Sequence, residues 1–241
     1  MAKPVVAQAG NLQVLDVSQG LRESIPVLLG VIPFGITCGI IGITTGLTHV
    51  ETILMSLLVF AGASQFVAMT MLGAGIADWS IIVFTTFLIN LRHFIMGASL
   101  APYMMKLPLP FQALLSFGMV DESYALTANR IYKVGYSPYY QLSVSMSLYL
   151  TWVISTVFGV MMGGYLANCL EWGLDFAMTA TFLVLLIPRL VDRISLLVCT
   201  LSGIIAVLAA LYLPGKWYII VACLVASVIG SIMERMRGHE K

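Results

Sequence analysis

Apolar residues along this chain gather into eight long runs that are separated by short, more polar connections. A run of about 20 apolar residues is long enough to cross the hydrocarbon core of a bilayer as one helix. The runs cover roughly Ile25–Leu47, Thr52–Leu72, Ile81–Ala101, Phe111–Ile131, Tyr140–Leu166, Leu174–Leu190, Ile194–Leu213 and Trp217–Met233. This pattern predicts an all-α integral membrane protein with about eight transmembrane helices in the lipid bilayer.

Lysine and arginine are distributed unevenly between the connections. An even number of spans places both termini on one side, which then carries Lys3, Arg22, Arg130, Lys133, Arg189, Arg193, Arg235, Arg237 and Lys241. The opposite side carries only Lys106 and Lys216. Basic residues concentrate on the cytoplasmic side of membrane proteins, so we predict that both termini are cytoplasmic. The predicted parts are a short N-terminal segment over 1–22, a single transmembrane domain over 23–234 and a basic tail over 235–241.

The composition supports a membrane protein, because 60% of the 241 residues are hydrophobic and only 10% are charged. Soluble domains carry about 25% charged residues. The net charge of +1 gives no reason to expect a nucleic-acid partner. The residues before the first run do not show the pattern of a signal peptide, which is a basic region, a short apolar region and a cleavage site. We therefore expect the first run to act as an uncleaved anchor. The four cysteines are widely spaced, and we expect neither a metal nor another cofactor.

The third run carries a positive charge near its middle, within the sequence Asn90-Leu91-Arg92-His93. An arginine at the centre of a transmembrane helix costs about 2.5–3.5 kcal/mol, so it must face protein or trapped water and find a partner. The fourth run carries Asp121 and Glu122 near its own middle. We therefore predict that these charges meet inside the membrane and mark a transport pathway.

The chemistry of these side chains suggests different roles for them. Arg92 stays protonated in practice and would serve as a charge anchor or a substrate clamp. His93 titrates near neutral pH and could relay a proton. One of the two carboxylates, Asp121 or Glu122, would pair with Arg92, and the other could carry a coupling proton. The alternative is a purely structural ion pair that holds the third span to the fourth.

Two further stretches combine small and polar residues at membrane depth. In the first run, Pro33, Phe34 and Gly35 would allow a helix break that exposes backbone amides and carbonyls. Broken helices line cavities in transporters, whereas an ordinary proline kink with glycines at a packing seam is the other reading. In the second run, Gly62, Ala63, Ser64 and Gln65 offer either substrate contacts or interhelical hydrogen bonds. We predict that both stretches, with Asn90 and Arg92, form the substrate pocket.

A short motif occurs twice in the chain. Phe34-Gly35-x-x-x-Gly39 in the first run returns as Phe158-Gly159-x-x-x-Gly163 in the fifth. Transporters are often built from internal repeats with the site at their interface, although glycine-rich apolar sequence also produces chance matches. We predict repeats over 25–101 and 140–213 that have the same orientation in the membrane.

Four motifs of this chain stand in a recognisable order. They are Gly30-x-x-Pro33-Phe34-Gly35, Gly62-Ala63-Ser64-Gln65-Phe66, Asn90-Leu91-Arg92-His93 and Asp121-Glu122-Ser123-Tyr124-Ala125. Together they resemble the AzlC family of branched-chain amino acid exporter subunits, over nearly the whole chain from about Arg22. The resemblance implies export of leucine, isoleucine, valine and related neutral amino acids across a bacterial inner membrane. It also implies a small hydrophobic AzlD-like membrane subunit as partner.

Other function classes find less support in the residues. The chain has no Walker A motif, so a gradient-driven secondary mechanism fits better than ATP hydrolysis. A transporter of another small solute stays an alternative, as does an ion or solute channel, which would need a ring of repeated polar groups. Gly62-Ala63-Ser64-Gln65 lacks the second glycine of a hydrolase Gly-x-Ser-x-Gly motif, and we expect no enzyme activity.

Overall fold

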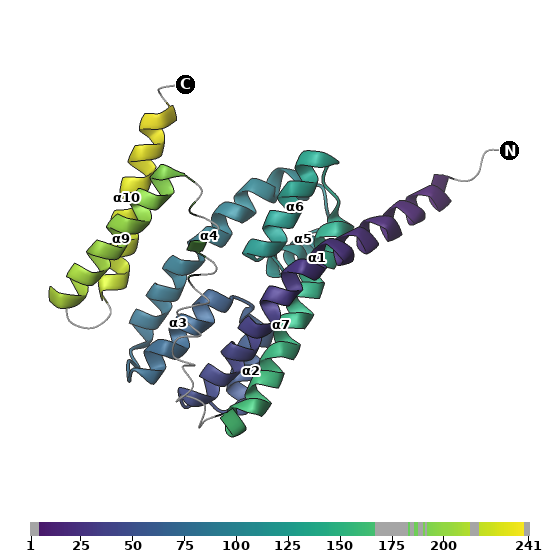
Figure 1. Ribbon diagram of the computed structural model, residues 1–241. Helices are drawn as coiled ribbons and strands as arrows, with labels where there is room; N and C mark the ends of the chain where they lie inside the picture. Colours follow the sequence, from purple (N-terminus) through teal and green to yellow (C-terminus); the bar gives the residue numbers. More distant parts are fainter. Residues whose placement is uncertain are drawn as a thin grey trace. The chain divides into compact units, whose positions relative to one another are not determined.

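The computed structural model is helical throughout the residues that it describes, with short turns and no strand there (Figure 1). The described residues are 5–166, 183, 186–187, 190, 192–212 and 217–238. The helices are α1 (Val5–Thr44), α2 (His49–Val59), α3 (Gly62–Gly73), α4 (Trp79–Met104), α5 (Leu109–Phe117), α6 (Asp121–Lys133), α7 (Pro138–Leu166), α9 (Arg193–Tyr212) and α10 (Trp217–Gly238). The chain forms two compact units, Met1–Glu171 and Trp172–Lys241, and α9 packs against α10 within the second.

Among the described residues, four helical stretches are long and apolar enough to cross a membrane. They are Val14–Thr44, Trp79–Met104, Pro138–Gly163 and Arg193–Tyr212, which match the first, third, fifth and seventh predicted runs. The eighth run lies in α10, and the sixth falls mostly outside the described residues. The all-helical prediction is confirmed for the described part, whereas the count of eight spans is not confirmed. Residues 5–22 continue into the first span as part of α1.

Two predicted spans are interrupted in their middle. The second predicted run is divided at Phe60 and Ala61 into α2 and α3, and the fourth is divided at 118–120 into α5 and α6. Phe60 has a left-handed backbone (φ 43°) and is the only non-glycine residue with positive φ in the described part. Such a conformation costs about 1–3 kcal/mol and persists only where surrounding contacts hold it.

The discontinuous helices that we expected are present, but in other runs and as hairpins. Gly73 at the end of α3 lies back against Thr45 at the end of α1, and Phe111 of α5 and Arg130 of α6 both lie beside the start of α7. Neither the second nor the fourth run therefore crosses the unit from end to end.

The break considered at Pro33 and Gly35 is absent, because α1 continues without interruption past Pro26 and Pro33. The structure supports the alternative interpretation, in which the glycines of this stretch allow α1 to pack closely against a neighbouring helix. A Cβ atom added at Gly39 would lie 2.3 Å from the Thr156 carbonyl oxygen of α7. One added at Gly159 would lie 2.1 Å from the Ile36 carbonyl oxygen of α1. Both glycines are needed for this close backbone approach.

The repeated motif thus packs against its own second copy along α1 and α7, which run side by side (Figure 1). Contact positions advance together on both helices, from Gly20 against Ser143 to Ile43 against Gly163. The two helices are therefore parallel. Parallel helices require an odd number of crossings between them. The predicted topology has three, whereas the structure places one there, α4, because Gly73 at the end of α3 lies back against Thr45 and Tyr103 at the end of α4 lies beside Tyr136. The internal repeat itself stays a prediction.

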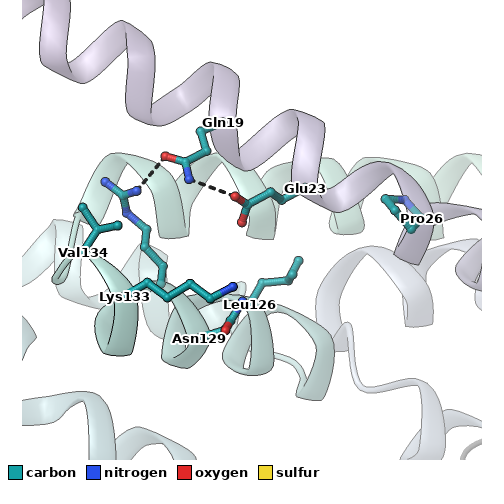
Figure 2. Close-up of a pocket in the computed structure, with 8 residues that line it drawn as sticks. Gln19, Glu23, Pro26, Leu126, Asn129, Lys133 and Val134 are labelled. Carbon is teal, nitrogen blue, oxygen red and sulfur yellow. Dashed lines mark hydrogen bonds between the residues drawn. The ribbon is translucent and has the colours of Figure 1, made fainter.

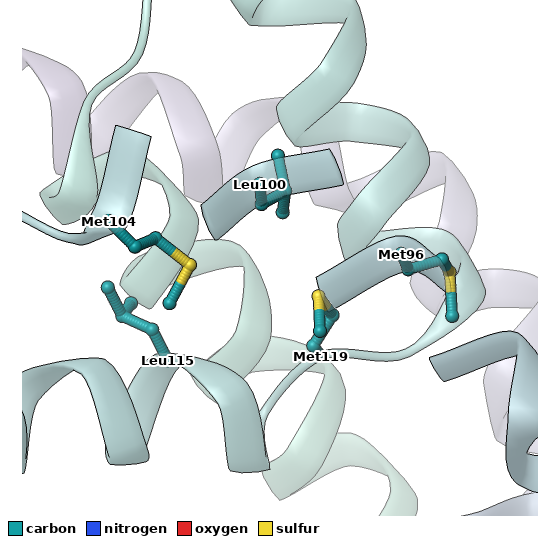
Figure 3. Packing of buried hydrophobic residues seen from close by; sticks show 5 residues of the cluster. All are labelled: Met96, Leu100, Met104, Leu115 and Met119. Carbon is teal, nitrogen blue, oxygen red and sulfur yellow. The ribbon is translucent and has the colours of Figure 1, made fainter. Parts of the chain in front are cut away.

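Apolar packing joins α4 to the second broken helix. Figure 3 shows Met96, Leu100 and Met104 of α4 together with Leu115 of α5 and Met119 of the break. All five side chains are buried. Met119 also lies against Gly97, whose added Cβ would be 3.4 Å from the Met119 methyl carbon. This cluster holds the start of α6 at a defined position beside α4.

Candidate functional site

The start of α3 carries two buried polar side chains, Ser64 and Gln65. The Gln65 amide donates a hydrogen bond of 2.9 Å to the Ser56 hydroxyl of α2. That hydroxyl donates in turn to Thr156 Oγ1 of α7 at 3.2 Å. Gln65 therefore uses its amide nitrogen for interhelical bonding, which leaves its carbonyl oxygen available.

Aromatic rings lie against this helix start. Phe34 of α1 stacks on Phe66 with 4.6 Å between ring centroids, and its centroid is 5.5 Å from that of Trp152. A Cβ atom added at Gly62 would lie 2.9 Å from Trp152 Cη2. The structure thus brings Phe34 and the start of α3 into direct contact, and Trp152 of α7 lies against both.

The neighbours of Phe34 point elsewhere. Pro33 is exposed in the described unit. Gly35 is buried against Ser155 of α7, where an added Cβ would lie 2.6 Å from the serine Cβ. Of the three residues predicted in the first run, the contacts join only Phe34 to the α3 start.

The two helix breaks are linked by an aromatic cluster on α7, which the sequence analysis did not single out. Phe60, at the first break, and Phe117, before the second, lie with ring centroids 5.1 and 5.6 Å from that of Tyr149. The Tyr149 hydroxyl donates to the Leu57 carbonyl at 2.9 Å. A helix that ends at a break leaves its last carbonyls without donors in the helix, and Tyr149 satisfies one of them.

The second break rests on the same helix. A Cβ atom added at Gly118 would lie 2.7 Å from the Ser145 Cβ of α7. Ser145, Tyr149 and Trp152 follow one another at i, i+4 and i+7, so they share one face of α7. Both breaks therefore meet a single face of α7. The sequence did not predict that both breaks contact α7, because aromatic residues such as Tyr149 in an apolar run are equally typical of ordinary apolar packing.

The predicted ion pair is present and connects α4 to α6. Arg92 Nη1 lies 2.6 Å from Asp121 Oδ2. The exposed fractions of the two side chains are 39% and 15% in the described part. Asp121 is the first residue of α6, where the positive end of the helix dipole favours a carboxylate. The structure thus selects Asp121 as the partner of Arg92, with Glu122 next to it in the same helical turn.

The start of α6 is fixed by its own local bonds. The Val120 backbone N–H donates to the Ser123 hydroxyl at 2.9 Å, and that hydroxyl donates to the Gly118 carbonyl at 3.1 Å. The serine oxygen therefore takes the place of a capping side chain. Asn90 and His93, on either side of Arg92, are half-buried.

Several buried polar atoms have no hydrogen-bond partner among the described residues. Six of them lie around the breaks or beside the ion pair: Ser64 Oγ, Gln65 Oε1, Ser145 Oγ, Trp152 Nε1, Asn90 Oδ1 and Arg92 Nε. The other two, Thr127 Oγ1 and Arg130 Nε, lie on α6. Buried polar atoms in folded proteins are nearly always hydrogen-bonded, to protein, water or a ligand. Their concentration at the two breaks and beside the ion pair indicates a site for a polar ligand. Within the described residues, no three His, Cys, Asp or Glu side chains are grouped to hold a metal ion.

Comparison with known proteins gives a consistent set of relatives. The family model described as AzlC protein matches residues 26–166. A protein of Archaeoglobus fulgidus named "Uncharacterized membrane protein" is 34% identical over 73% of this chain and 76% of its own length. The "Inner membrane protein YgaZ" of Escherichia coli is 29% identical over 90% of this chain and 89% of its own length.

A third relative carries a functional name. The "Branched-chain amino acid transport protein AzlC" of Bacillus subtilis is 33% identical over 69% of this chain and 65% of its own length. No solved structure gives a significant match to the chain. The matched region 26–166 contains both helix breaks, the α7 face and the Arg92–Asp121 pair.

Proposed function

The chain belongs to the AzlC family, and from that premise we propose that it is a secondary transporter exporting branched-chain amino acids. It is an integral membrane protein with all-helical described residues. The observation that carries the proposal is the meeting of two helix breaks on one face of α7, surrounded by buried polar atoms without partners. Discontinuous helices form the substrate sites of many transporters.

The ends of a zwitterionic substrate find complementary groups at this site. Helix α3 begins without a side-chain cap, so its first amides can receive a carboxylate. Arg92 offers a second position for that carboxylate. Asp121, Glu122 or the carbonyls at a break can receive the ammonium group. We assign the binding of the carboxylate and ammonium groups to these residues and to Gln65.

The apolar part of the substrate is matched by the aromatic rings. Phe34, Phe66 and Trp152 form a wall beside the first break. A branched aliphatic side chain would gain about 25 cal/mol per Å² of apolar surface that it buries there. This wall supports leucine, isoleucine and valine over polar amino acids as substrates.

Coupling to an ion gradient belongs to the same proposal. Arg92 keeps its charge, and Asp121 balances it. His93 and Glu122 are the candidates for carrying a coupling proton. We further propose that the protein works in a bacterial inner membrane, with cytoplasmic termini and a small AzlD-like membrane subunit. The exposed apolar side chains of α4, among them Phe87, Leu91 and Phe94, suit lipid or such a subunit.

Efflux from proteoliposomes tests the proposal. The chain is reconstituted with its partner subunit, and saturable leucine and valine efflux is the expected result. Arg92→Ala and Glu122→Gln should each reduce it at least about tenfold, since each removes a group that the substrate or proton contacts. Lys106→Met, a charge loss away from the site, is the matched control. Unaltered efflux in both site variants would exclude the proposed site, and ohmic, non-saturable flux would indicate a channel instead.

A further inference from the structure

A second polar cluster lies away from the helix breaks, where the first half of α1 meets the end of α6 and the start of α7. Arg130 of α6 forms an ion pair with Asp16 and donates to the Gln19 side chain at 2.8 Å. Its guanidinium lies 4.8 Å from the centroid of the Tyr140 ring. Arg130 is only 8% exposed, so these contacts hold it in one position.

Glu23 belongs to the same cluster. It accepts hydrogen bonds from the Gln19 amide at 2.8 Å and from the Tyr140 hydroxyl. Both partners are neutral, so they orient the carboxylate without cancelling its charge. Arg130 and Lys133 stabilise the charge of Glu23 from a distance, and the carboxylate can still accept further hydrogen bonds from a cation.

A cavity of about 290 Å³ opens between α1 and α6 at this cluster. Its walls include Gln19, Glu23 and Pro26 from α1 and Leu126, Asn129 and Lys133 from α6. A water molecule occupies about 30 Å³ in the liquid, so the cavity has room for about nine non-hydrogen atoms, the size of leucine. Figure 2 shows Glu23 pointing from α1 into the gap, and Lys133 lying across it from α6.

The charges of this cavity are opposite and separate. Among the described residues, neither Glu23 nor Lys133 takes part in an ion pair, although both line the cavity. The network of Asp16, Gln19 and Arg130 holds the helices together without Lys133. Lys133 stands in the last turn of α6, where a cation is favoured, and its charge acts on Glu23 across the cavity without a direct ion pair. A carboxylate on one wall and an ammonium on the other match the two ends of a zwitterion.

We propose that this cavity is a second binding site for an α-amino acid with a short branched side chain. Lys133 receives its carboxylate, Glu23 receives its ammonium group, and Pro26 and Leu126 contact its side chain. Arg22, Arg130 and Lys133 belong to the side that the basic residues assign to the cytoplasm. The cavity is then a loading site for the exported amino acid, a role that rests on the proposed function.

Equilibrium binding of radiolabelled L-leucine to the purified full-length protein tests this inference. In an Arg92→Ala background, which impairs the site at the breaks, leucine binding should persist. Adding Lys133→Met or Glu23→Gln should weaken that binding at least about tenfold, whereas Lys106→Met should leave it unchanged. A glutamine side chain has the shape of glutamate and still accepts hydrogen bonds, so the Glu23→Gln variant isolates the charge.

Two leucine derivatives identify the contacts. Leucinamide lacks the carboxylate and N-acetyl-leucine lacks the ammonium group, so both should bind the cavity weakly. Lys133→Met should remove the preference for leucine over leucinamide, and Glu23→Gln the preference for leucine over N-acetyl-leucine. Wild-type affinities and preferences in both variants would overturn the second site.

Leucine flux through the wild-type protein, reconstituted with its partner subunit in proteoliposomes, separates this inference from the proposed function. If leucine is transported but binding ignores Lys133 and Glu23, only the second site is overturned. If no leucine flux occurs, the proposed function is overturned. Binding that still depends on Lys133 and Glu23 in that case would support the cavity as an amino-acid site alone.

Discussion

Arg92 occupies the middle of a 26-residue helix that is apolar enough to cross a membrane. Its 2.6 Å contact with Asp121 provides the partner that this position requires. Removing one partner of such a pair leaves the other charge uncompensated, which costs more than the pair contributes. The pair can therefore serve the stability of the protein, its transport activity, or both, and substitution of both partners separates these roles.

For the Arg92–Asp121 pair, we expect Arg92→Gln and Asp121→Asn each to lower the free energy of unfolding by about 1–3 kcal/mol. The double variant should lose less than the sum, with a coupling energy of about 1–2 kcal/mol. Unfolding in detergent micelles measures these values. If the pair were purely structural, the double variant would also regain leucine transport. We expect it to stay inactive, because Arg92 also contacts the substrate.

Gly62 has no room for a side chain beside Trp152. An added Cβ would lie 2.9 Å from the ring, so Gly62→Ala must displace Trp152 or the start of α3. Because small displacements at a binding site reduce turnover strongly, we expect leucine transport to fall at least about tenfold. Gly30→Ala is the matched control, since no atom lies within 4 Å of its added Cβ. Equal transport by the two variants would show that Gly62 is not part of the site.

At the scale of helices, the two breaks are stabilised from outside by α7. Phe60 adopts an unfavourable backbone conformation, and Tyr149 both packs against its ring and bonds the Leu57 carbonyl. At the second break, Gly118 packs closely against Ser145 of α7. The breaks therefore depend on contacts between distant parts of the chain rather than on proline or glycine alone.

Tyr149→Phe keeps the ring contacts and removes only the hydroxyl. The Leu57 carbonyl then loses its donor, and an unsatisfied buried carbonyl costs about 1–3 kcal/mol. We expect the free energy of unfolding to decrease by that amount, measured by denaturation in micelles. Tyr132→Phe, at a side chain that is 95% exposed, should change stability by less than about 0.5 kcal/mol. A Tyr149→Phe protein as stable as the control would mean that water serves the carbonyl equally well.

These helices also show which signals in the sequence were informative. Asn90-Leu91-Arg92-His93 and Asp121-Glu122 predicted an ion pair between two spans, because charges in lipid need partners. Pro33 and Gly35 did not mark a break, since a proline within a helix costs little where the neighbouring helix packs closely. The true breaks at Phe60 and Gly118 had weaker local signals and depend on α7.

At the scale of the molecule, the structure bears on topology independently of the charge count. Helices α1 and α7 are parallel, and Asp16 near the start of α1 pairs with Arg130 at the end of α6. Residues 16–23 and 130–140 therefore lie at one end of the first unit. The distribution of Lys and Arg had assigned Arg22, Arg130 and Lys133 to one side as well. The two observations agree for Arg22, Arg130 and Lys133.

The two observations disagree for Lys106, because the ring centroid of Tyr103 at the end of α4 lies 5.7 Å from that of Tyr136, which places the turn after α4 at the same end of the unit. The prediction that Lys106 lies on the opposite side is therefore wrong.

Labelling from the two sides of the membrane tests this topology. In a variant without the four natural cysteines, His49→Cys should react with a membrane-impermeant maleimide added outside intact cells, because His49 follows the far end of α1 from Asp16. Lys3→Cys and Arg237→Cys should react only after the membrane is opened, since we predict cytoplasmic termini. Reaction of Arg237→Cys in intact cells would indicate an odd number of spans.

The sequence by itself determined that this chain is a helical membrane protein and that Arg92 needs an acidic partner. Those properties follow from run length and from the cost of charge in lipid, which are local and can be read along the chain. Only the tertiary structure decided that Asp121 pairs with Arg92, that the helices break at Phe60 and Gly118, and that Glu23 faces Lys133 across a cavity. These features depend on contacts between residues far apart in sequence, and hydrophobic periodicity carries no information about them.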